Sequence, residues 1–167
     1  QQCGGSEPHS GDTLGPVGIR IEPITEEQYE TLLPMIADYQ RFYGRREIDE
    51  AANRSFFRRF IAPSDAGMLI GAWGDGELLG YACLYWHFTS VGAAETVLMN
   101  DLYVAEAARS SGVGRALIDR CAEVARSRGV RRLEWATRPD NETARRLYDA
   151  TGAEASTWVT YQLDVGV

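Results

Sequence analysis

A short glycine-bearing stretch offers the clearest chemistry in the sequence. Residues 109–114 read Arg-Ser-Ser-Gly-Val-Gly, and they stand between an apolar strand-like run ending at Val104 and a helical pattern. A loop that enters a helix N-terminus presents free N–H groups and a positive dipole end, which together bind phosphate. Gly112 and Gly114 leave the backbone open to a ligand. The stretch contains neither GxGxxG nor GK[ST], so we expect neither NAD nor ATP.

The surrounding pattern predicts the elements that hold this loop. Alternating apolar residues and turn signals indicate strands, and apolar residues at helical spacing indicate helices, with Thr25 as the first N-cap. The predicted strands are 19–22, 68–73, 77–88, 95–104, 133–137 and 157–165, and the predicted helices are 25–43, 50–61, 114–128 and 141–150. The order β-α-α-β-β-β-α-β-α-β predicts an α/β fold with a mixed sheet, antiparallel first and parallel later. Residues 19–167 are predicted to form one domain, preceded by a tail, 1–18, that is either flexible or not native to the protein.

Composition narrows the class of protein. The chain has 167 residues, a formal net charge of −7 and 17 basic residues that are all arginine. Without lysine there is no Schiff-base chemistry, and the acidic balance opposes nucleic acid as the main partner. Three separated cysteines and two histidines predict no metal centre. We expect no membrane partner and a cytoplasmic location, because the sequence shows no secretory signal and no long apolar run.

With these elements around it, residues 109–114 resemble the R/Q-x-x-G-x-G/A signature of the GNAT superfamily of acyl-CoA-dependent N-acyltransferases. The resemblance extends over 19–165, because the predicted element order is also that of the family. It implies acetyl-CoA as co-substrate, with its pyrophosphate on the loop and its pantetheine along the preceding strand. The cofactor-binding residues implied in this way are Leu102, Tyr103, Val104, Arg109, Ser110, Ser111, Gly112, Val113, Gly114 and Arg115.

The resemblance also assigns roles to Asn141 and Tyr148, which lie seven residues apart and so share a helix face. The family commonly has an asparagine here that touches CoA and a tyrosine near its thiol. Acyl transfer to an amine expels a thiolate, and a phenol with a reference pKa of about 10 can protonate it. The alternative is that Asn141 is a helix cap and Tyr148 a core aromatic.

The attacking amine must lose a proton, and three residues are candidates for the group that takes it. Asp101 is the first candidate, because a charged residue in so apolar a strand is costly to bury and a catalytic role would explain it. An ion pair with an arginine is the structural alternative. His87 is the second candidate, since its pKa suits the task, and Glu95 is the third. The run from Asn100 to Val104 also resembles the diamine and polyamine acetyltransferase branch, from which it departs by having Asn100 where that branch tends to have glutamate.

The family builds its acceptor pocket from the first two helices and the long hairpin. Here the resemblance assigns substrate contacts to Asp38, Tyr39, Tyr43, Tyr85, Trp86 and Asn100. Aromatic rings with a carboxylate suit an alkylammonium group through cation–π and charge contacts. The same residues are alternatively core packing and a dimer surface.

These observations predict an N-acetyltransferase that acts on a primary amine of a small molecule, diamine- or polyamine-like, by direct attack in a ternary complex. A homodimer is a further expectation from the family. Three alternatives stay open: an amino acid, aminoglycoside or protein N-terminus as acceptor; a CoA-binding sensor without turnover; and a nucleic-acid binder. The last would depend on the arginine cluster at 126–132.

Overall fold

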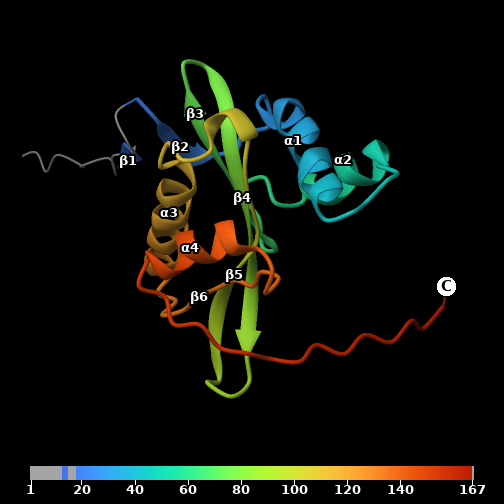
Figure 1. Cartoon of the computed structure of the whole chain (residues 1–167), viewed down its shortest axis with the longest axis vertical. Coiled ribbons are helices and arrows are strands. Elements are labelled where there is room, and N and C mark those ends of the chain that lie inside the picture. Colours follow the sequence, from blue (N-terminus) through green and yellow to red (C-terminus); the bar gives the residue numbers. More distant parts are fainter. Residues whose placement is uncertain (1–12, 15–17, 167) are drawn as a thin grey trace, which may run out of the picture. The chain divides into compact units, whose positions relative to one another are not determined.

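The computed structural model describes residues 13–14 and 18–166. The chain divides into two compact units, Gln1–Ala136 and Thr137–Val167. The first contains the sheet and three helices, and the second contains one helix and the C-terminal segment (Figure 1). No helix in the described ranges is long and apolar enough to cross a membrane.

The sheet of the first unit has its strands in sequence order. They are β1 (Thr13–Leu14), β2 (Arg20–Pro23), β3 (Gly67–Gly74), β4 (Glu77–Thr89), β5 (Ala94–Val104) and β6 (Leu133–Glu134). Neighbours pair antiparallel as far as β5, whereas β5 and β6 pair parallel, so the predicted mixed sheet is confirmed. The β3–β4 hairpin turns at Asp75 and Gly76, both with positive φ, as a tight primed turn requires.

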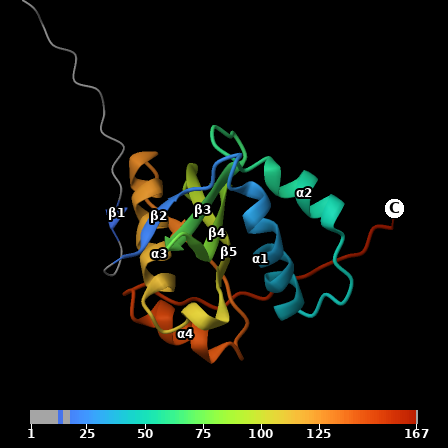
Figure 2. The same ribbon diagram turned by 90° about the horizontal axis from the view of Figure 1, so that it is seen from above.

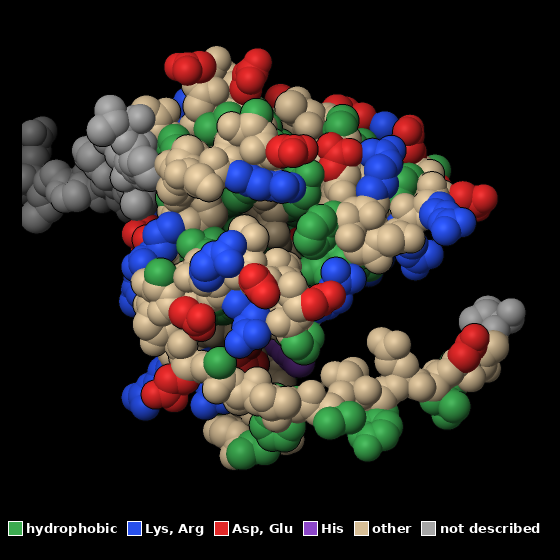
Figure 3. Space-filling model, viewed as in Figure 1, with side chains coloured by type: hydrophobic (Ala, Val, Ile, Leu, Met, Phe, Trp, Pro, Cys, Tyr) green, Lys and Arg blue, Asp and Glu red, His purple; other side chains and the backbone are tan. Residues whose placement is uncertain are grey.

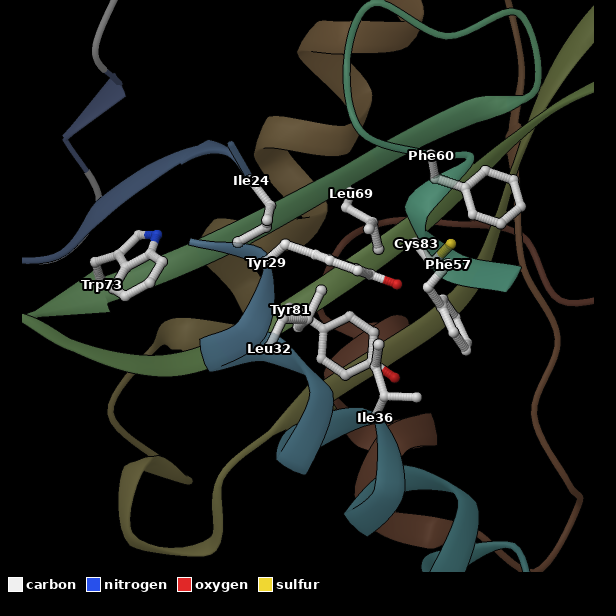
Figure 4. Packing of buried hydrophobic residues seen from close by; sticks show 10 residues of the cluster. All are labelled: Ile24, Tyr29, Leu32, Ile36, Phe57, Phe60, Leu69, Trp73, Tyr81 and Cys83. Carbon is white, nitrogen blue, oxygen red and sulfur yellow. The ribbon is translucent and has the colours of Figure 1, made fainter. Parts of the chain in front are cut away.

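Helices cover both faces of this sheet. Helices α1 (Tyr29–Phe42) and α2 (Glu50–Arg58) lie on one face, and α3 (Val113–Ser127) lies on the other (Figure 2). Between α1, α2 and the sheet, a cluster of buried side chains forms the main core (Figure 4). Its α1 members Tyr29, Leu32 and Ile36 keep helical spacing, which places them on one buried face.

The helix predicted after the phosphate loop is confirmed, with each bound one residue earlier than predicted. Gly112 is the N-cap of α3 with a φ of 88°, and Gly129 follows the helix with a φ of 73°. Both angles lie in the left-handed region, which glycine adopts without the steric penalty of a side chain. The buried face of α3 is apolar, including Leu117, Cys121 and Val124, and this face fixes the helix on the sheet.

Some boundaries differ from the prediction. Helix α1 begins at Tyr29 rather than after Thr25, because residues 25–29 form tighter turns in which Gln28 N donates to Thr25 O (3.2 Å). Gln28 is the N-cap of α1, so Thr25 is not the cap, although the Gln28 side chain accepts from Thr25 N (3.0 Å) as in one half of a capping box. Helix α2 ends at Arg58, and β6 has only two residues.

The second unit contains helix α4 (Glu142–Asp149), close to its predicted bounds. The predicted final strand at 157–165 is wrong: residues 153–166 form neither helix nor strand in the structure. Alternating side chains predict which faces a strand would have, but a strand exists only when its backbone finds a hydrogen-bonding partner.

The N-terminal segment 1–18 lies outside the described residues except for Thr13, Leu14 and Gly18. Thr13 and Leu14 pair antiparallel with Ile21 and Arg20 of β2. The edge of β2 offers free backbone groups, so this short part of the predicted tail belongs to the sheet.

Candidate active site

The loop between β5 and α3 has the geometry of an anion site. A 3₁₀ turn at Glu106–Ala108 follows β5, and Ser110 and Gly112 both have positive φ before the helix begins. Helix α3 has no side-chain cap at Gly112 and no acidic residue in its first turn. No carboxylate therefore competes with an anion for the first N–H groups of this helix. Ser111 Oγ donates to Ala108 O (2.6 Å), which closes the loop on itself.

Two arginines flank this loop. Arg109 Nε donates to the carbonyl of Val104 (3.3 Å), and its guanidinium lies 6.0 Å from the centre of the Tyr103 ring. These contacts tie the loop to the end of β5. Arg115, in the first turn of α3, forms an exposed ion pair with Asp119 (3.0 Å).

The strand before the loop has one open edge. Residues Leu102–Val104 pair with Gly80–Ala82 of β4, but β6 pairs with β5 only at Val97 and Leu98. Toward its C-terminal end, β5 therefore has a strand partner on one side only, among the residues described. Backbone groups on the free side remain available to bind an extended ligand.

A β-bulge sits next to this open edge. In the β4–β5 ladder Cys83 is opposite Asp101 and Leu84 is opposite Met99, so Asn100 is the extra residue. A bulge re-aims neighbouring side chains, and here it brings the side chains of Asn100 and Asp101 together. Asn100 Nδ2 donates to Asp101 Oδ1 (2.9 Å) and to the Tyr85 hydroxyl (3.2 Å).

Asp101 is a buried carboxyl group, only 3% exposed. Burial raises its pKa from 3.8 to about 6, while hydrogen bonds from Tyr39 and Asn100 favour the ionised form and oppose part of that rise. The salt bridges of the described residues do not include Asp101. The structural alternative, an ion pair with arginine, therefore finds no support.

Tyrosine side chains surround Asp101. The Tyr39 hydroxyl donates to the Asn100 carbonyl (3.4 Å), and the Tyr39 ring lies 4.9 Å from Tyr43 and 6.3 Å from both Tyr81 and Tyr103. Burial is the main cause that raises the pKa of Tyr39, with the charge of Asp101 adding to it. The raised pKa keeps the Tyr39 phenol neutral, so it is a hydrogen-bond donor near the carboxylate.

Two members of this cluster were not predicted from the sequence as site residues. Tyr81 is fully buried, and its hydroxyl has no hydrogen-bond partner in the described part of the chain. Cys83 is also buried, opposite Asp101 in the ladder. The available signal was the alternation of β4, which puts Tyr81, Cys83 and Tyr85 on one face. Tyr85 stacks on Phe60 of the core (4.9 Å), which holds its hydroxyl beside Asn100.

The remaining predicted residues lie apart from this cluster. Asp38 forms an exposed ion pair with Arg41 (2.7 Å). Trp86 is on the other face of β4 from Tyr85, where the Arg128 guanidinium lies 3.9 Å from its ring centre. His87 is exposed and four residues beyond Cys83, about 13 Å along the strand at a strand rise of about 3.3 Å per residue. Glu95 pairs with Arg128 (3.7 Å).

In the second unit, Asn141 and Tyr148 belong to α4. Asn141 is its N-cap: Oδ1 accepts from Ala144 N (3.2 Å), and Nδ2 donates to Thr137 Oγ1 (3.1 Å). The capping role considered for Asn141 is thus present, and Nδ2 and Oδ1 are both engaged within the unit. Tyr148 lies one residue before the end of the helix and is half-buried.

The described residues contain no group of three or more histidine, cysteine or acidic side chains placed to hold a metal ion. A cavity of about 590 Å³ is also present in the first unit, but its lining comes from residues 89–96 and 128–132. None of the residues of the Asp101 cluster lines it.

The first unit thus combines a mixed sheet, a strand with an open edge, a loop at a helix N-terminus and a buried carboxyl group. Residues 32–153 match the model of the acetyltransferase (GNAT) family. The chain belongs to this family and is an acetyltransferase enzyme, and the family uses acetyl-CoA as co-substrate.

Similar proteins include acetyltransferases from bacteria and eukaryotes. The chain is 32% identical over 135 residues to the N-acetyltransferase YhfO of Bacillus subtilis, covering 80% of this chain and 89% of that protein. It is 36% identical over 135 residues to the D-amino-acid N-acetyltransferase HPA3 of Saccharomyces cerevisiae, covering 77% and 78%. It is 27% identical over 159 residues to a thialysine N-epsilon-acetyltransferase of Caenorhabditis elegans, covering 87% and 90%. Among solved structures, a probable acetyltransferase is similar with a TM-score of 0.77 and 28% identity, covering 89% of this chain and 99% of that one.

Proposed function

We propose that this enzyme transfers the acetyl group of acetyl-CoA to a primary amine of a small, cationic molecule by direct attack in a ternary complex. The observation that carries the proposal is Asp101, a buried carboxyl group without an arginine partner in the described residues, at a bulge beside the open edge of β5. Burying an ionisable group without a charged partner costs folding free energy, and such groups cluster at functional sites.

The end of β5, the loop that follows it and the start of α3 suit CoA as a ligand. Helix α3 is uncapped and free of acids in its first turn, so the N–H groups of residues 112–115 suit the pyrophosphate. The open edge of Leu102–Val104 suits the amide groups of the pantetheine, and Arg109 and Ser110 complete the loop. Asn141 is proposed as a further CoA contact. Acetyl-CoA brings the activated thioester, and the chain's own residues orient it and handle the protons.

Asp101 is proposed as the proton acceptor. The amine nitrogen forms a bond to the acetyl carbon, the carbon–sulfur bond breaks, and the proton of the amine passes to the Asp101 carboxylate. A carboxyl with a pKa of about 6 is a better base than an ordinary aspartate and is still mostly ionised at neutral pH. Tyr148 is proposed to give its proton to the leaving thiolate, and both groups then exchange protons with water.

His87 and Glu95 receive less support as bases. His87 is exposed and far along the strand from Asp101, and Glu95 is occupied by Arg128. A covalent route through cysteine is also disfavoured, because burial raises the pKa of the Cys83 thiol well above its usual value. A thiol held in its protonated form is a poor nucleophile, which supports direct attack.

The acceptor is proposed to bind against Tyr39, Tyr43, Tyr85 and Asn100, in front of Asp101. Aromatic faces and a carboxylate attract an ammonium group, which favours diamine- or polyamine-like acceptors. Asp38 is less suited to this task than the sequence suggested, because Arg41 neutralises it. Trp86 belongs to the opposite face of β4 and is left out of the proposed pocket.

An amino acid is the second candidate acceptor. Burial raises the pKa of Tyr85, and the positive charge of Arg59 opposes part of that rise. The Arg59 guanidinium lies 4.7 Å from the centre of the Phe56 ring. A cation therefore lies near one side of the proposed pocket. An arginine at that place suits an acceptor that carries a carboxylate. The names of two relatives, a D-amino-acid and a thialysine acetyltransferase, agree with this candidate.

The deciding experiment is thiol release from acetyl-CoA with spermidine, short diamines, aminoglycosides, D- and L-amino acids, lysine analogues and peptides. Turnover of the diamines supports the first candidate, and turnover of amino acids supports the second. In that case Arg59→Ala should raise the KM of carboxylate-bearing acceptors and leave that of diamines unchanged. CoA binding without turnover on any acceptor would refute the proposal in favour of a sensor.

A homodimer and a cytoplasmic location are proposed as well, both carried over from the sequence. Nucleic acid remains an unfavourable partner, because two arginines of the 126–132 cluster are already paired, Arg128 with Glu95 and Arg132 with Glu134.

A further inference from the structure

Asn100 and Asp101 are consecutive residues whose side chains meet, which a regular strand does not allow. Successive side chains of a strand point to opposite faces of the sheet. Here the register shift between Cys83 and Leu84 of β4 leaves Asn100 as an extra residue on β5. The Asn100 amide can therefore reach the neighbouring carboxylate, and Nδ2 donates to Asp101 Oδ1 at 2.9 Å.

The Asn100 side chain is held in one orientation by its contacts. Nδ2 has two N–H groups, and it donates to Asp101 Oδ1 and to the Tyr85 hydroxyl (3.2 Å). The Tyr85 ring is in turn stacked on Phe60 of the core, with 4.9 Å between the ring centres. The backbone carbonyl of Asn100 accepts from the Tyr39 hydroxyl (3.4 Å), which ties the bulge to α1. Because an ionised carboxylate only accepts hydrogen bonds, the NH2 end of the amide is the end that matches Asp101.

The groups that face Asp101 are mostly uncharged. They are Tyr39 and Tyr43 from α1, Tyr81, Cys83 and Tyr85 from β4 and Tyr103 from β5, with Arg59 at the end of α2 acting on Tyr85 and Cys121 of α3 acting on Cys83. Phenols and thiols have reference pKa values of about 8.5–10, so they are neutral at the pH where a carboxyl group titrates. Figure 3 shows acidic and basic side chains interspersed over the exposed face, where charges of opposite sign offset one another. Local hydrogen bonds therefore decide how Asp101 ionises.

Burial and hydrogen bonds act on Asp101 in opposite directions. Burial raises its pKa to about 6, and the hydrogen bonds from Tyr39 and Asn100 lower it. Without the bond from Asn100 the pKa would be higher still, and less carboxylate would be present at neutral pH. Asn100 is exposed on the bulge, so its side chain can be changed without disturbing the core.

We propose that Asn100 is the positioning residue of the base: its amide orients the Asp101 carboxylate and stabilises the ionised form that takes the proton of the acceptor amine. This role rests on the proposed function, in which Asp101 is the proton acceptor. A carboxylate has about four lone-pair sites, so the bonds from Asn100 and Tyr39 leave room for an N–H group of the acceptor. The Asn100 Oδ1 atom is not used in these bonds and stays available to the acceptor. A contact with the acceptor alone, however, would not change the ionisation of Asp101.

Direct titration of Asp101 tests this role without acetyl transfer. In protein with isotope-labelled aspartate, the NMR signal of the Asp101 carboxyl carbon, assigned by its loss in Asp101→Asn, should titrate near pH 6. Asn100→Leu keeps a similar size and removes the donor. Its Asp101 pKa should be higher by about one unit, the lower end of what one hydrogen bond to a charged group contributes.

Thr96→Val is the matched control. Thr96 belongs to the same strand, and its buried hydroxyl has no hydrogen-bond partner among the described residues. Valine has nearly the same shape, so this change removes a polar group from β5 without touching the Asp101 carboxylate. The titration of Asp101 should be unchanged in Thr96→Val.

The pH profile of kcat/KM then shows whether the shift reaches catalysis. Its acid limb should move up by the same unit in Asn100→Leu. The variant should therefore lose about 2-fold relative to the wild type at pH 7 and about 5-fold at pH 6. An acceptor contact alone would instead give the same fold-loss at every pH.

The two measurements separate failure of this role from failure of the proposed function. An unchanged Asp101 pKa in Asn100→Leu would overturn the positioning role, whatever the activity. A raised pKa with an acid limb that does not move would refute Asp101 as the base, and with it the proposed mechanism. If Asn100→Leu does not fold, Asn100→Ala makes the same deletion without added bulk at this exposed position, and the same criteria apply to it.

Discussion

Replacing Asp101 with asparagine separates the catalytic role of this carboxyl group from its structural one. Asparagine keeps the size of the side chain and an oxygen that can accept the Asn100 Nδ2 hydrogen bond, but it cannot take a proton. If Asp101 is the base, turnover should fall by a factor of about 10²–10⁴, the usual contribution of a positioned general base. CoA affinity should change little, because the loop and α3 are untouched.

The wild-type pH profile gives an independent signature. The Asp101 pKa is about 6 in the folded protein, so its carboxylate form is lost as the pH falls through that value. kcat/KM should therefore decrease below pH 6 in the wild type, and the residual activity of Asp101→Asn should lack this limb.

The same substitution should stabilise the protein at neutral pH. The folded pKa lies above the unfolded value of 3.8, so the protonated form favours folding, and this contribution is lost as the pH rises toward about 6. The rise corresponds to about 3 kcal/mol at 1.36 kcal/mol per pKa unit. Asp101→Asn should accordingly be more stable than the wild type by up to about 3 kcal/mol above pH 7, with the difference vanishing below pH 4.

Initial rates test the catalytic role of Asp101, and denaturant unfolding at several pH values tests the change in stability. Both are measured on the same preparations. Asp65→Asn, at an exposed position, serves as the matched control and should change neither quantity. Full turnover of Asp101→Asn across the pH range would refute the assignment of the base. Loss of activity together with lower stability at neutral pH would instead make Asp101 a structural residue.

The remaining predictions concern the CoA site. Gly112→Glu should abolish CoA binding in calorimetry, because it adds a bulky side chain and a like charge at the α3 N-terminus; Gly129→Glu, at the other left-handed glycine of α3, controls for backbone strain and should bind normally. Unchanged affinity of a folded Gly112→Glu protein would remove the pyrophosphate from this loop. Tyr148→Phe should lower kcat far more than it weakens CoA binding, and a variant with normal kcat would exclude Tyr148 as the acid.

The sequence by itself determined the fold class, the family and the place of the loop. Glycine is the residue that tolerates a φ of 88° at Gly112, and the apolar spacing of α3 defines its buried face, so both features can be read locally. The hairpin at Asp75 and Gly76 is local in the same sense.

The tertiary structure decided the features that depend on partners distant in sequence. The bulge at Asn100 exists because the register of the β4–β5 pair shifts by one residue. The sequence of one strand does not specify the register of its partner. Among the described residues, Asp101 has no arginine partner and the Tyr81 hydroxyl has no hydrogen-bond partner. Both features follow from packing between the strands and α1. The segment 157–165 has the local signs of a strand, yet a strand forms only when its backbone pairs with another, and residues 153–166 form no strand in the structure.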